Sequence, residues 1–263
     1  GKTFSGIATI GLMEQQGKAK KPIIVVPKSI VWKWVADINT LFPDWTVGVI
    51  GSTKKYYKSG RAYYPTDSPQ QRGLKYLKFS QGLYDVLVVP YEKLMTTPIS
   101  KETFDKYLRK VVRITVNAMP EQKGSAKARR RKRRKAVAKV VSKISLPSSI
   151  KLDEGIIWDD LNIDFLMVDE AQNFKNLFTP QLTLSENIKY LGVGRPSTRA
   201  FQLDMRCEDV RSRNGAIVLL SATPAKNSPI EFWNLIQYVA PEAFEQLPTP
   251  RHFMRRYIEI ASK

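Results

Sequence analysis

Short runs of apolar, mostly β-branched residues recur along the chain and are separated by segments with helical periodicity. The apolar runs lie at residues 23–26, 86–89, 165–168 and 216–220. Runs of this length without polar interruption are typical of strands buried on both faces of a sheet. Helical patterns lie between them, at residues 30–41, 70–81, 198–213 and 230–239. The alternation predicts an α/β domain with a mostly parallel sheet and helices on both faces.

Two segments interrupt this alternation. Residues 51–69 mix Gly, Ser, Pro and Lys with four tyrosines, which predicts a long surface loop. Residues 113–150 include seven consecutive basic residues at 129–135. Because like charges repel one another, we expect this second segment to be an insertion that is mobile, or only transiently helical, without a polyanion.

The length and composition fit one large α/β domain that carries this insertion. Hydrophobic residues make up 43% of the 263 and charged residues 25%, which is ordinary for a globular protein with a sizeable core. We find no apolar run long enough for a membrane helix and no signal-peptide pattern, so we expect a cytosol-like compartment: the cytoplasm, the nucleoid or a viral setting, and the nucleus if the host is a eukaryote. A lone Cys207 and a lone His252 exclude a disulfide framework and a Cys/His zinc site within one chain. Any metal must be held by oxygens.

The formal net charge of +19 is concentrated in the two interrupting segments. Residues 113–143 hold twelve Lys/Arg against one acidic residue, and residues 53–78 hold seven against one. Together these segments account for +17, so the rest of the chain is nearly neutral. A surface this basic favours a polyanionic partner.

The chain opens with Gly1-Lys2-Thr3, followed by a helical pattern. These residues resemble the end of a phosphate-binding loop. Such a loop surrounds phosphates with backbone N–H groups and a helix N-terminus, places Lys2 on the β/γ-phosphates and places the Thr3 hydroxyl on Mg²⁺. Three residues alone are weak evidence, and the earlier glycine of the motif is absent from the chain.

Ligands of parallel α/β sheets bind beyond the carboxyl ends of the strands, so the residues that follow each apolar run are candidates for chemistry. The third run is followed by Asp169 and Glu170. One such carboxylate can bind Mg²⁺ while the next positions an attacking water, whereas an isolated Asp-Glu pair is a common surface dipeptide. The fourth run is followed by Ser221, Ala222 and Thr223. Their hydroxyls can link the carboxylates to a moving second lobe, or they can form a simple turn before a proline.

Further segments in the same order make a resemblance specific. They are residues 27–34 (PKSIVWKW), 84–91 (YDVLVVPY), 168–176 (VDEAQNFKN), 219–228 (LLSATPAKNS) and 231–233 (EFW). These segments resemble motif Ia, motif Ib, motif II, motif III and the helix after motif III of Swi/Snf-like ATPases. The match covers nearly the whole chain outside the two basic segments, and it implies that residues 1–263 resemble the first RecA-like lobe of a longer superfamily-two nucleic-acid motor.

The resemblance implies a P-loop nucleotide hydrolase that uses ATP and Mg²⁺. The implied catalytic residues are Lys2, Asp169, Glu170 and Gln172. The implied ATP-binding residues are Gly1, Lys2 and Thr3, and the implied Mg²⁺ ligands are Thr3 and Asp169. Ser221, Ala222 and Thr223 would couple the site to a second RecA-like lobe of the same protein, whose arginine fingers the reaction requires.

The resemblance also implies nucleic-acid contacts. Around motifs Ia and Ib, Lys28, Ser29 and Tyr91 would contact the phosphate backbone of the tracking strand, and such contacts fix position without reading base sequence. The basic run consists of Arg129, Arg130, Arg131, Lys132, Arg133, Arg134 and Lys135. Solvated charge is one interpretation of this run, and contact with nucleic acid is a compatible second one. The tyrosines of residues 56–64 either stack on bases or pack on their own loop.

Three functions remain open from the sequence. The leading hypothesis is an ATP-driven translocase on duplex DNA; the alternatives are a strand-separating DNA or RNA helicase and a non-catalytic nucleic-acid-binding scaffold. Lys175-Asn176 and Asn227-Ser228 favour translocation. Gln172, where Swi/Snf-like proteins usually have His, and Ser-Ala-Thr, a form of motif III that is commoner in other superfamily-two helicases, favour a helicase. The spacing around residues 173–177, with Arg199-Ala200 before motif III, also resembles large helicases of phages and mobile elements.

Overall fold

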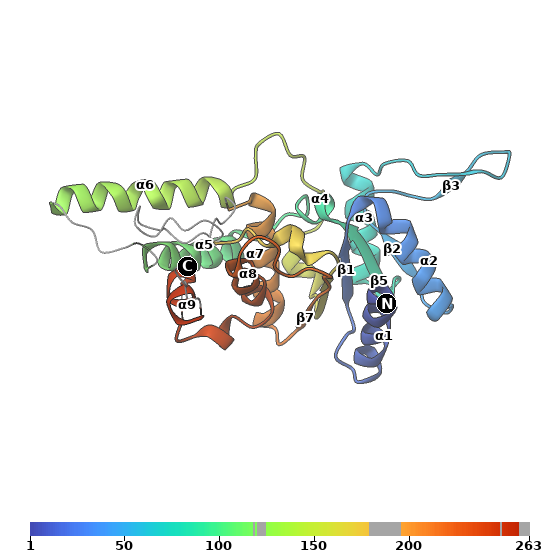
Figure 1. The fold of residues 1–263 in the computed structure, drawn as a ribbon. Helices are drawn as coiled ribbons and strands as arrows, with labels where there is room; N and C mark the ends of the chain where they lie inside the picture. Colours follow the sequence, from blue (N-terminus) through green and yellow to red (C-terminus); the bar gives the residue numbers. More distant parts are fainter. Residues whose placement is uncertain (118, 120–124, 179–195, 248, 258–263) are drawn as a thin grey trace. The chain divides into compact units, whose positions relative to one another are not determined.

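The computed structural model describes residues 1–117, 119, 125–178, 196–247 and 249–257 (Figure 1). By their contacts the residues form two compact units. Unit 1 comprises residues 1–101, 148–170 and 207–221. Unit 2 comprises residues 102–147, 171–206 and 222–263. The single lobe with a basic insertion at 113–150 stays a prediction.

A five-stranded sheet forms the centre of unit 1. Its order is β2-β5-β1-β6-β7, and every pair of neighbouring strands is parallel. The α/β class and the four predicted strands are confirmed. The sequence pattern did not predict β2, because three residues are too short for a periodic signal. The bounds are β1 Pro22–Val26, β2 Val47–Val49, β5 Val86–Pro90, β6 Phe165–Val168 and β7 Ala216–Leu219.

Strands β1, β5 and β6 are buried on both faces, as their uninterrupted apolar runs predicted, whereas β7 is only half-buried. One face packs against α1 (Lys2–Gln15) and α2 (Val31–Leu41). Neighbours along β1, such as Ile23 and Ile24, point to opposite faces, and both are fully buried. The core on the α1 and α2 face includes Ile7, Ile10, Ile24, Val26, Trp34, Ile38, Val86, Val88 and Met167.

The order of the strands determines where the connecting helices lie. α2 connects β1 to β2 in one direction along the sheet, and α3 (Pro69–Ser80) connects β2 back to β5 in the other. Because crossovers between parallel strands are right-handed, α2 and α3 lie on opposite faces. This winding brings the carboxyl ends of β1, β5 and β6 to one edge, where the short η1 (Lys28–Ile30) and α4 (Tyr91–Leu94) follow two of them.

The segment 51–69 contains a small antiparallel hairpin, where the sequence predicted only a loop. Its strands are β3 (Lys55–Tyr56) and β4 (Ala62–Tyr63), and Gly60 turns the chain with φ +81°. A pair of tyrosines on each side of the turn at Gly60 fits such a hairpin, because aromatic residues favour strands. Figure 1 shows it as a long projection from the end of β2.

Unit 2 is built from helices. Tyr107 donates a hydrogen bond of 2.7 Å to Asp204, and Gln202 donates one of 2.8 Å to the carbonyl of Ile144, so three of its helices are joined by buried polar contacts. α7 belongs to unit 2 up to Arg206 and to unit 1 beyond it. The described helices are α5 Lys101–Asn117, α6 Ala126–Ile144, η3 Ala171–Phe174, α7 Thr198–Ser212, α8 Pro229–Val239, η5 Pro241–Phe244 and α9 Pro250–Tyr257.

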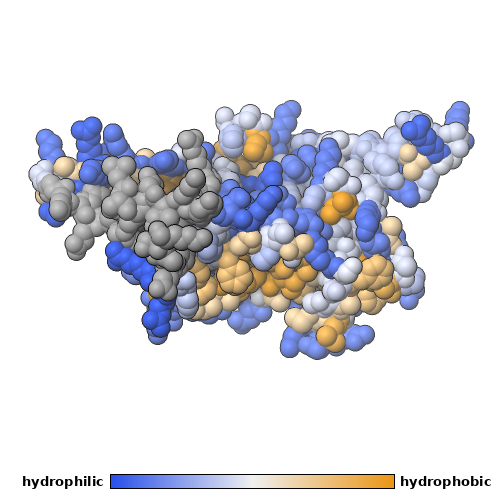
Figure 2. All heavy atoms as spheres, viewed as in Figure 1, coloured by the Kyte–Doolittle hydropathy of each residue, from blue (hydrophilic) through white to orange (hydrophobic). Residues whose placement is uncertain are grey.

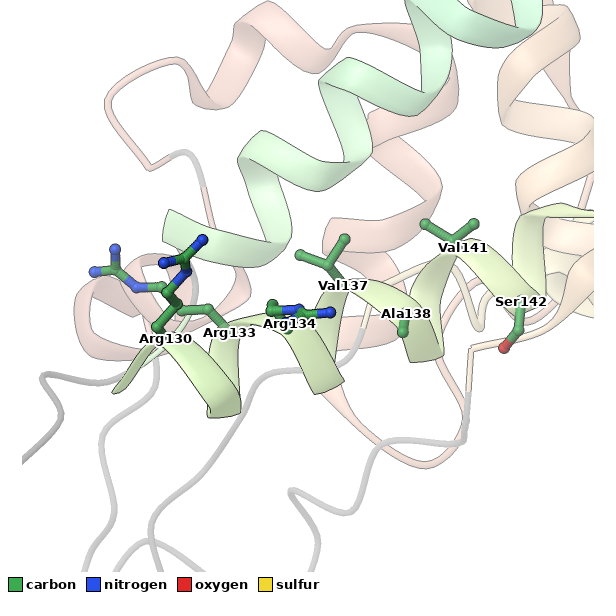
Figure 3. Close-up of a pocket in the computed structure, with 7 residues that line it drawn as sticks. All are labelled: Arg130, Arg133, Arg134, Val137, Ala138, Val141 and Ser142. Atoms are coloured by element: carbon green, nitrogen blue, oxygen red, sulfur yellow. The ribbon is translucent and has the colours of Figure 1, made fainter. Parts of the chain in front are cut away.

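The basic run lies in a regular 19-residue helix, α6, where at most transient helix was expected. Ala, Arg and Lys are good helix formers, and the hydroxyl of Ser125 caps the helix by accepting a hydrogen bond from the N–H of Ala128. Val137 and Val141 point to the side on which α5 runs (Figure 3), and Ile144 is fully buried. An apolar face in the second half of α6 thus outweighs the repulsion along its first half.

None of the helices in the described part of the chain is long and apolar enough to cross a bilayer.

An ion pair in unit 1 provides a test of the packing. Arg72 on α3 pairs with Asp153, and the two side chains are 4% and 0% exposed. Removing one partner leaves a buried charge without compensation, so Arg72→Met should lower the free energy of unfolding by about 3–5 kcal/mol. Lys33→Met is the control, because its pair with Asp37 leaves Lys33 65% exposed and should cost less than about 1 kcal/mol. Equal losses in denaturant titrations of the two variants would contradict this packing.

Candidate active site at the carboxyl ends of the strands

The N-terminus of α1 has the features of an anion site. Gly1 is its N-cap, no side chain caps the helix, and the first turn contains no acidic residue. The first N–H groups of a helix have no partner within it, and the helix dipole adds positive potential there. Lys2 and Thr3, the first two residues of α1, place an ammonium group and a hydroxyl at this end.

The structure brings Lys2 and Glu170 together from distant parts of the chain. Lys2 Nζ lies 2.7 Å from Glu170 Oε1, and about a third of each side chain is exposed. Glu170 follows β6, so the N-terminus of α1 and the end of β6 meet at one place. Two of the predicted catalytic residues therefore form one site.

Asp169 lies beside this pair and is 4% exposed. Its Oδ2 accepts a hydrogen bond of 2.9 Å from Trp34 Nε1, and its Oδ1 accepts one of 2.8 Å from the N–H of Glu170. The N–H of Asp169 in turn donates to the carbonyl of Val25 on β1. These bonds fix the carboxylate in one orientation, and each oxygen keeps a further lone pair for another ligand.

Tyr91 supports the backbone of the acidic pair. Its hydroxyl donates to the carbonyl of Asp169 and lies 3.4 Å from the carbonyl of Glu170. Glu170 has φ +50°, a left-handed conformation that is unusual for a residue other than glycine and needs such support. Tyr91 is 4% exposed, so its burial argues against the nucleic-acid contact expected from the sequence. We assign it instead to positioning Asp169 and Glu170.

Cations gather at the same edge of the sheet, beyond β1 and β5. Lys28 and Ser29 are exposed in η1, as a contact with phosphate requires. Lys93 on α4 is half-buried, and its pKa is lowered by burial and by the nearby charges of Arg72 and Lys28. Lys93 is a candidate that the sequence analysis missed, because a single lysine in a turn after motif Ib carries no pattern.

In unit 2 the continuation of motif II meets the helix after motif III. Lys175 Nζ lies 2.7 Å from Glu231 Oε1 on α8. Glu231 Oε2 also accepts hydrogen bonds from the N–H groups of Lys226 and Asn227, at 2.8 and 3.1 Å. Nearby, the Asn234 amide donates to the carbonyl of Lys175. Both segments stand out in the sequence, but their junction through Glu231 does not.

The remaining predicted residues follow β6 or β7 in the chain. They are Gln172, Ser221, Ala222 and Thr223. Gln172 is half-buried in η3 of unit 2. The N–H of Leu220 donates to the carbonyl of Val168, so Ser221 follows β7 at the edge where Asp169 follows β6. Ala222 and Thr223, in unit 2, are exposed. The coupling role of these residues stays a prediction.

The donor set fits magnesium nucleotide better than a metal held by protein alone. Among the described residues, no three His, Cys, Asp or Glu side chains gather as a metal site. Mg²⁺ commonly uses one or two carboxylates, with phosphate oxygens and water as its other ligands. Asp169 can provide such a carboxylate ligand, and the adjacent helix N-terminus and Lys2 can hold the phosphates.

Known proteins resemble this chain over most of its length. A family model described as a probable helicase domain matches residues 1–250. The chain is 22% identical over 280 residues to "Defense against restriction protein B" of Escherichia phage P1, covering 94% of this chain and 12% of that protein. The chain thus spans about an eighth of that relative's length. Among solved structures it is similar to the Sulfolobus solfataricus SWI2/SNF2 ATPase core in complex with dsDNA, with a TM-score of 0.44, 14% identity, and coverage of 98% of this chain and 32% of that one.

The junction at Glu231 predicts a pH dependence of stability. Burial alone would raise the pKa of Glu231, but its hydrogen bonds from Lys175, Lys226 and Asn227 outweigh burial and lower it below 4.5. A carboxylate with a lowered pKa stabilises the fold above its unfolded-state pKa, and this stability is lost as the pH falls through the folded-state pKa. Glu231→Gln should therefore cost about 1.5–3 kcal/mol at pH 7, a deficit that shrinks below pH 4.5.

Chemical denaturation at several pH values measures this deficit. The exposed Glu245 of the same unit provides the matched control, and Glu245→Gln should change stability by less than about 0.5 kcal/mol. A deficit for Glu231→Gln that stays constant as the pH falls well below 4.5 would contradict the proposed junction.

Proposed function

The chain belongs to the family of probable helicase domains, and on this basis we propose that it is the ATP-hydrolysing lobe of a motor that moves along duplex DNA. The observation that carries the proposal is the meeting of Lys2 with Glu170 beside the buried Asp169. A cation at a helix N-terminus next to two carboxylates is the arrangement that phosphoryl transfer from MgATP needs.

Each residue of the site has a distinct task in this proposal. Gly1 and Lys2 would hold the phosphates, through the first N–H groups of α1 and the ammonium group. Thr3 and Asp169 would hold Mg²⁺, which neutralises charge on the phosphates. Glu170 would orient the attacking water, assisted by Gln172. The Lys2–Glu170 pair must then separate, so that Lys2 turns to phosphate and Glu170 to water.

Hydrolysis in this proposal requires a second RecA-like lobe. Transition-state charge on the phosphoryl group is commonly stabilised by an arginine finger, and Ser221, Ala222 and Thr223 would couple the site to the lobe that supplies it. Lys28, Ser29 and Lys93 would contact the phosphate backbone of DNA at the edge of the sheet. Contacts of this kind let a motor move without regard to base sequence.

Strand separation is the alternative activity, and a non-catalytic scaffold is a third. The Lys2–Glu170 pair and the hydrogen bonds on Asp169 support catalysis over a scaffold, because they keep the ammonium group and the two carboxylates together at the N-terminus of α1. The similarity to a phage protein over 94% of the chain favours a viral or mobile-element setting for the motor.

The first functional test separates water positioning from phosphate binding. In the protein that contains this chain, Glu170→Gln should leave ATP affinity within about twofold and lower turnover by about 10² to 10⁴-fold, because it removes the group that orients water. Lys2→Ala should instead weaken nucleotide binding by about tenfold or more, since it removes a charge-assisted bond to phosphate. Binding titrations and single-turnover hydrolysis measure the two effects. Unchanged hydrolysis by Glu170→Gln would refute the assignment.

The second functional test concerns α6, which we propose as a contact for the DNA backbone. All seven residues at 129–135 are exposed, and the whole helix carries ten basic residues and no acidic one. Figure 2 shows hydrophilic residues along it. If several of these side chains meet phosphates, each releases condensed counterions on binding duplex DNA.

Replacing the seven residues with Gln, a good helix former, should weaken DNA binding at low salt. The slope of log K against log salt should flatten by about 0.9 for each phosphate that the helix no longer neutralises, and base preference should stay the same because the phosphate backbone carries no sequence information. Titrations from low to moderate salt give the slope. A slope equal to that of the wild type would show that the helix is only solvated or binds a protein.

A further inference from the structure

The β3–β4 hairpin, residues 54–64, combines cations and aromatic rings at one exposed place. Residues 52–66 contain four basic residues and no acidic residue. Tyr56 is 62% exposed and Tyr57 is 54% exposed. The hairpin that carries these two tyrosines projects as a long ribbon (Figure 1). Cations beside exposed rings favour a partner that is both anionic and aromatic.

The base of the hairpin is fixed by a half-buried cation. Lys75 Nζ on α3 lies within 2.9 Å of four oxygens, on Val49, Ser52, Thr53 and Asp67. Burial lowers the pKa of Lys75, while its bond to Asp67 opposes that shift. The two strands leaving this point are joined by further bonds: Thr53 N–H to Pro65 O, Asp67 N–H to Gly51 O, and Thr53 Oγ1 to Asp67 Oδ1. We call this set of contacts around Lys75 the clamp. It holds the base of the hairpin in one conformation.

The clamp places the hairpin beside the cations at the edge of the sheet. The ring of Tyr64 lies 4.9 Å from the ring of Trp32, which follows Lys28 and Ser29 at the start of α2. Just before the hairpin in the chain, Gly51 packs closely on Lys93. A Cβ added to Gly51 would lie 2.8 Å from the Cγ of Lys93. The hairpin thus begins where motifs Ia and Ib present their cations.

One tyrosine forms a supported stacking surface. Tyr57 and Tyr63 stack with ring centroids 4.4 Å apart and an interplanar angle of 28°. This stacking covers one face of the Tyr57 ring, yet more than half of the side chain stays exposed. A second ring, Tyr56, lies under the ammonium group of Lys54 at 5.3 Å. The tyrosines therefore pack partly on their own hairpin and also offer ring faces to a ligand.

We propose that this hairpin stacks Tyr56 and Tyr57 on unpaired bases at the junction between duplex and single-stranded nucleic acid. Base faces are covered inside a duplex and become available only at ends, junctions and single strands, where stacking on aromatic side chains is sequence-tolerant. Lys54, Lys55, Lys58 and Arg61 hold the adjacent phosphates. The inference rests on the proposed motor function, and it gives that motor an element that recognises the point where strands part.

Binding without ATP tests the inference separately from hydrolysis. The protein that contains the chain is titrated, at one salt concentration, with a forked DNA that has unpaired arms and with a blunt duplex of the same sequence. The wild type should prefer the fork. Tyr56→Ser with Tyr57→Ser should weaken fork binding by about tenfold or more, as expected when one or two bases no longer stack, and should leave binding of the blunt duplex within about twofold.

Two further variants make the comparison specific. Tyr56→Phe with Tyr57→Phe keeps both rings and should retain the fork preference. Tyr257→Ser removes an equally exposed tyrosine from α9 and should bind both DNAs as the wild type does. Thermal unfolding of all variants should match the wild type, because the substituted side chains lie on the surface.

Either of two results would overturn the inference: a serine variant that binds the fork as tightly as the wild type, or one that loses fork and duplex affinity equally and so reveals a backbone contact. Hydrolysis of ATP by the wild type, with and without DNA, is measured alongside. A wild type that prefers forks but hydrolyses no ATP contradicts the motor while supporting the hairpin.

Discussion

The hydrogen bonds that hold the buried carboxylate of Asp169 are the interaction on which the rest of the site depends. A carboxylate that is 4% exposed is stable only when its oxygens are satisfied. Its partners come from α2, through Trp34, and from the next peptide, through the N–H of Glu170. Its backbone is tied to β1 and to Tyr91 on α4. Three elements, α2, β1 and α4, therefore converge on the residue that follows β6.

This convergence also connects Asp169 to the cations of η1 and α4. α2 begins directly after η1, which contains Lys28 and Ser29, and α4 carries both Tyr91 and Lys93. A ligand that shifts η1 or α4 would act on the same helices that hold Asp169 and Glu170. Trp34 and Tyr91 thus form a short connection between the residues proposed to contact a phosphate backbone and the carboxylates proposed to be catalytic.

The sequence was sufficient for the sheet and for bringing the candidate residues Lys2, Asp169 and Glu170 to one place, because both predictions rest on local signals. Uninterrupted apolar runs predict strands buried on both faces, and a parallel sheet brings the residues after them to one edge. Asp169 and Glu170 were found in this way, and Lys2 through its motif. The hydrogen-bond partners of Asp169 could not be predicted, since nothing in the sequence around Trp34 or Tyr91 indicates that their side chains turn toward Asp169. Glu231 was equally hidden, because its three hydrogen-bond donors come from two separate segments.

In the two basic segments, charge alone does not predict the secondary structure. Both were seen as breaks in the α/β pattern, yet α6 is a regular helix because its second half has an apolar face, and residues 51–69 include a clamped hairpin because Lys75 ties the two strands together at their base. Their chemistry also differs. The cations on the first half of α6 surround the helix and carry no aromatic ring, which suits the uniform phosphate backbone of a duplex. The cations of the hairpin are interleaved with exposed tyrosines, which suits bases that have left the duplex. In the proposed motor the first surface would contact the duplex, and the second would contact bases only where the two strands part, so the two basic segments would bind different parts of one substrate.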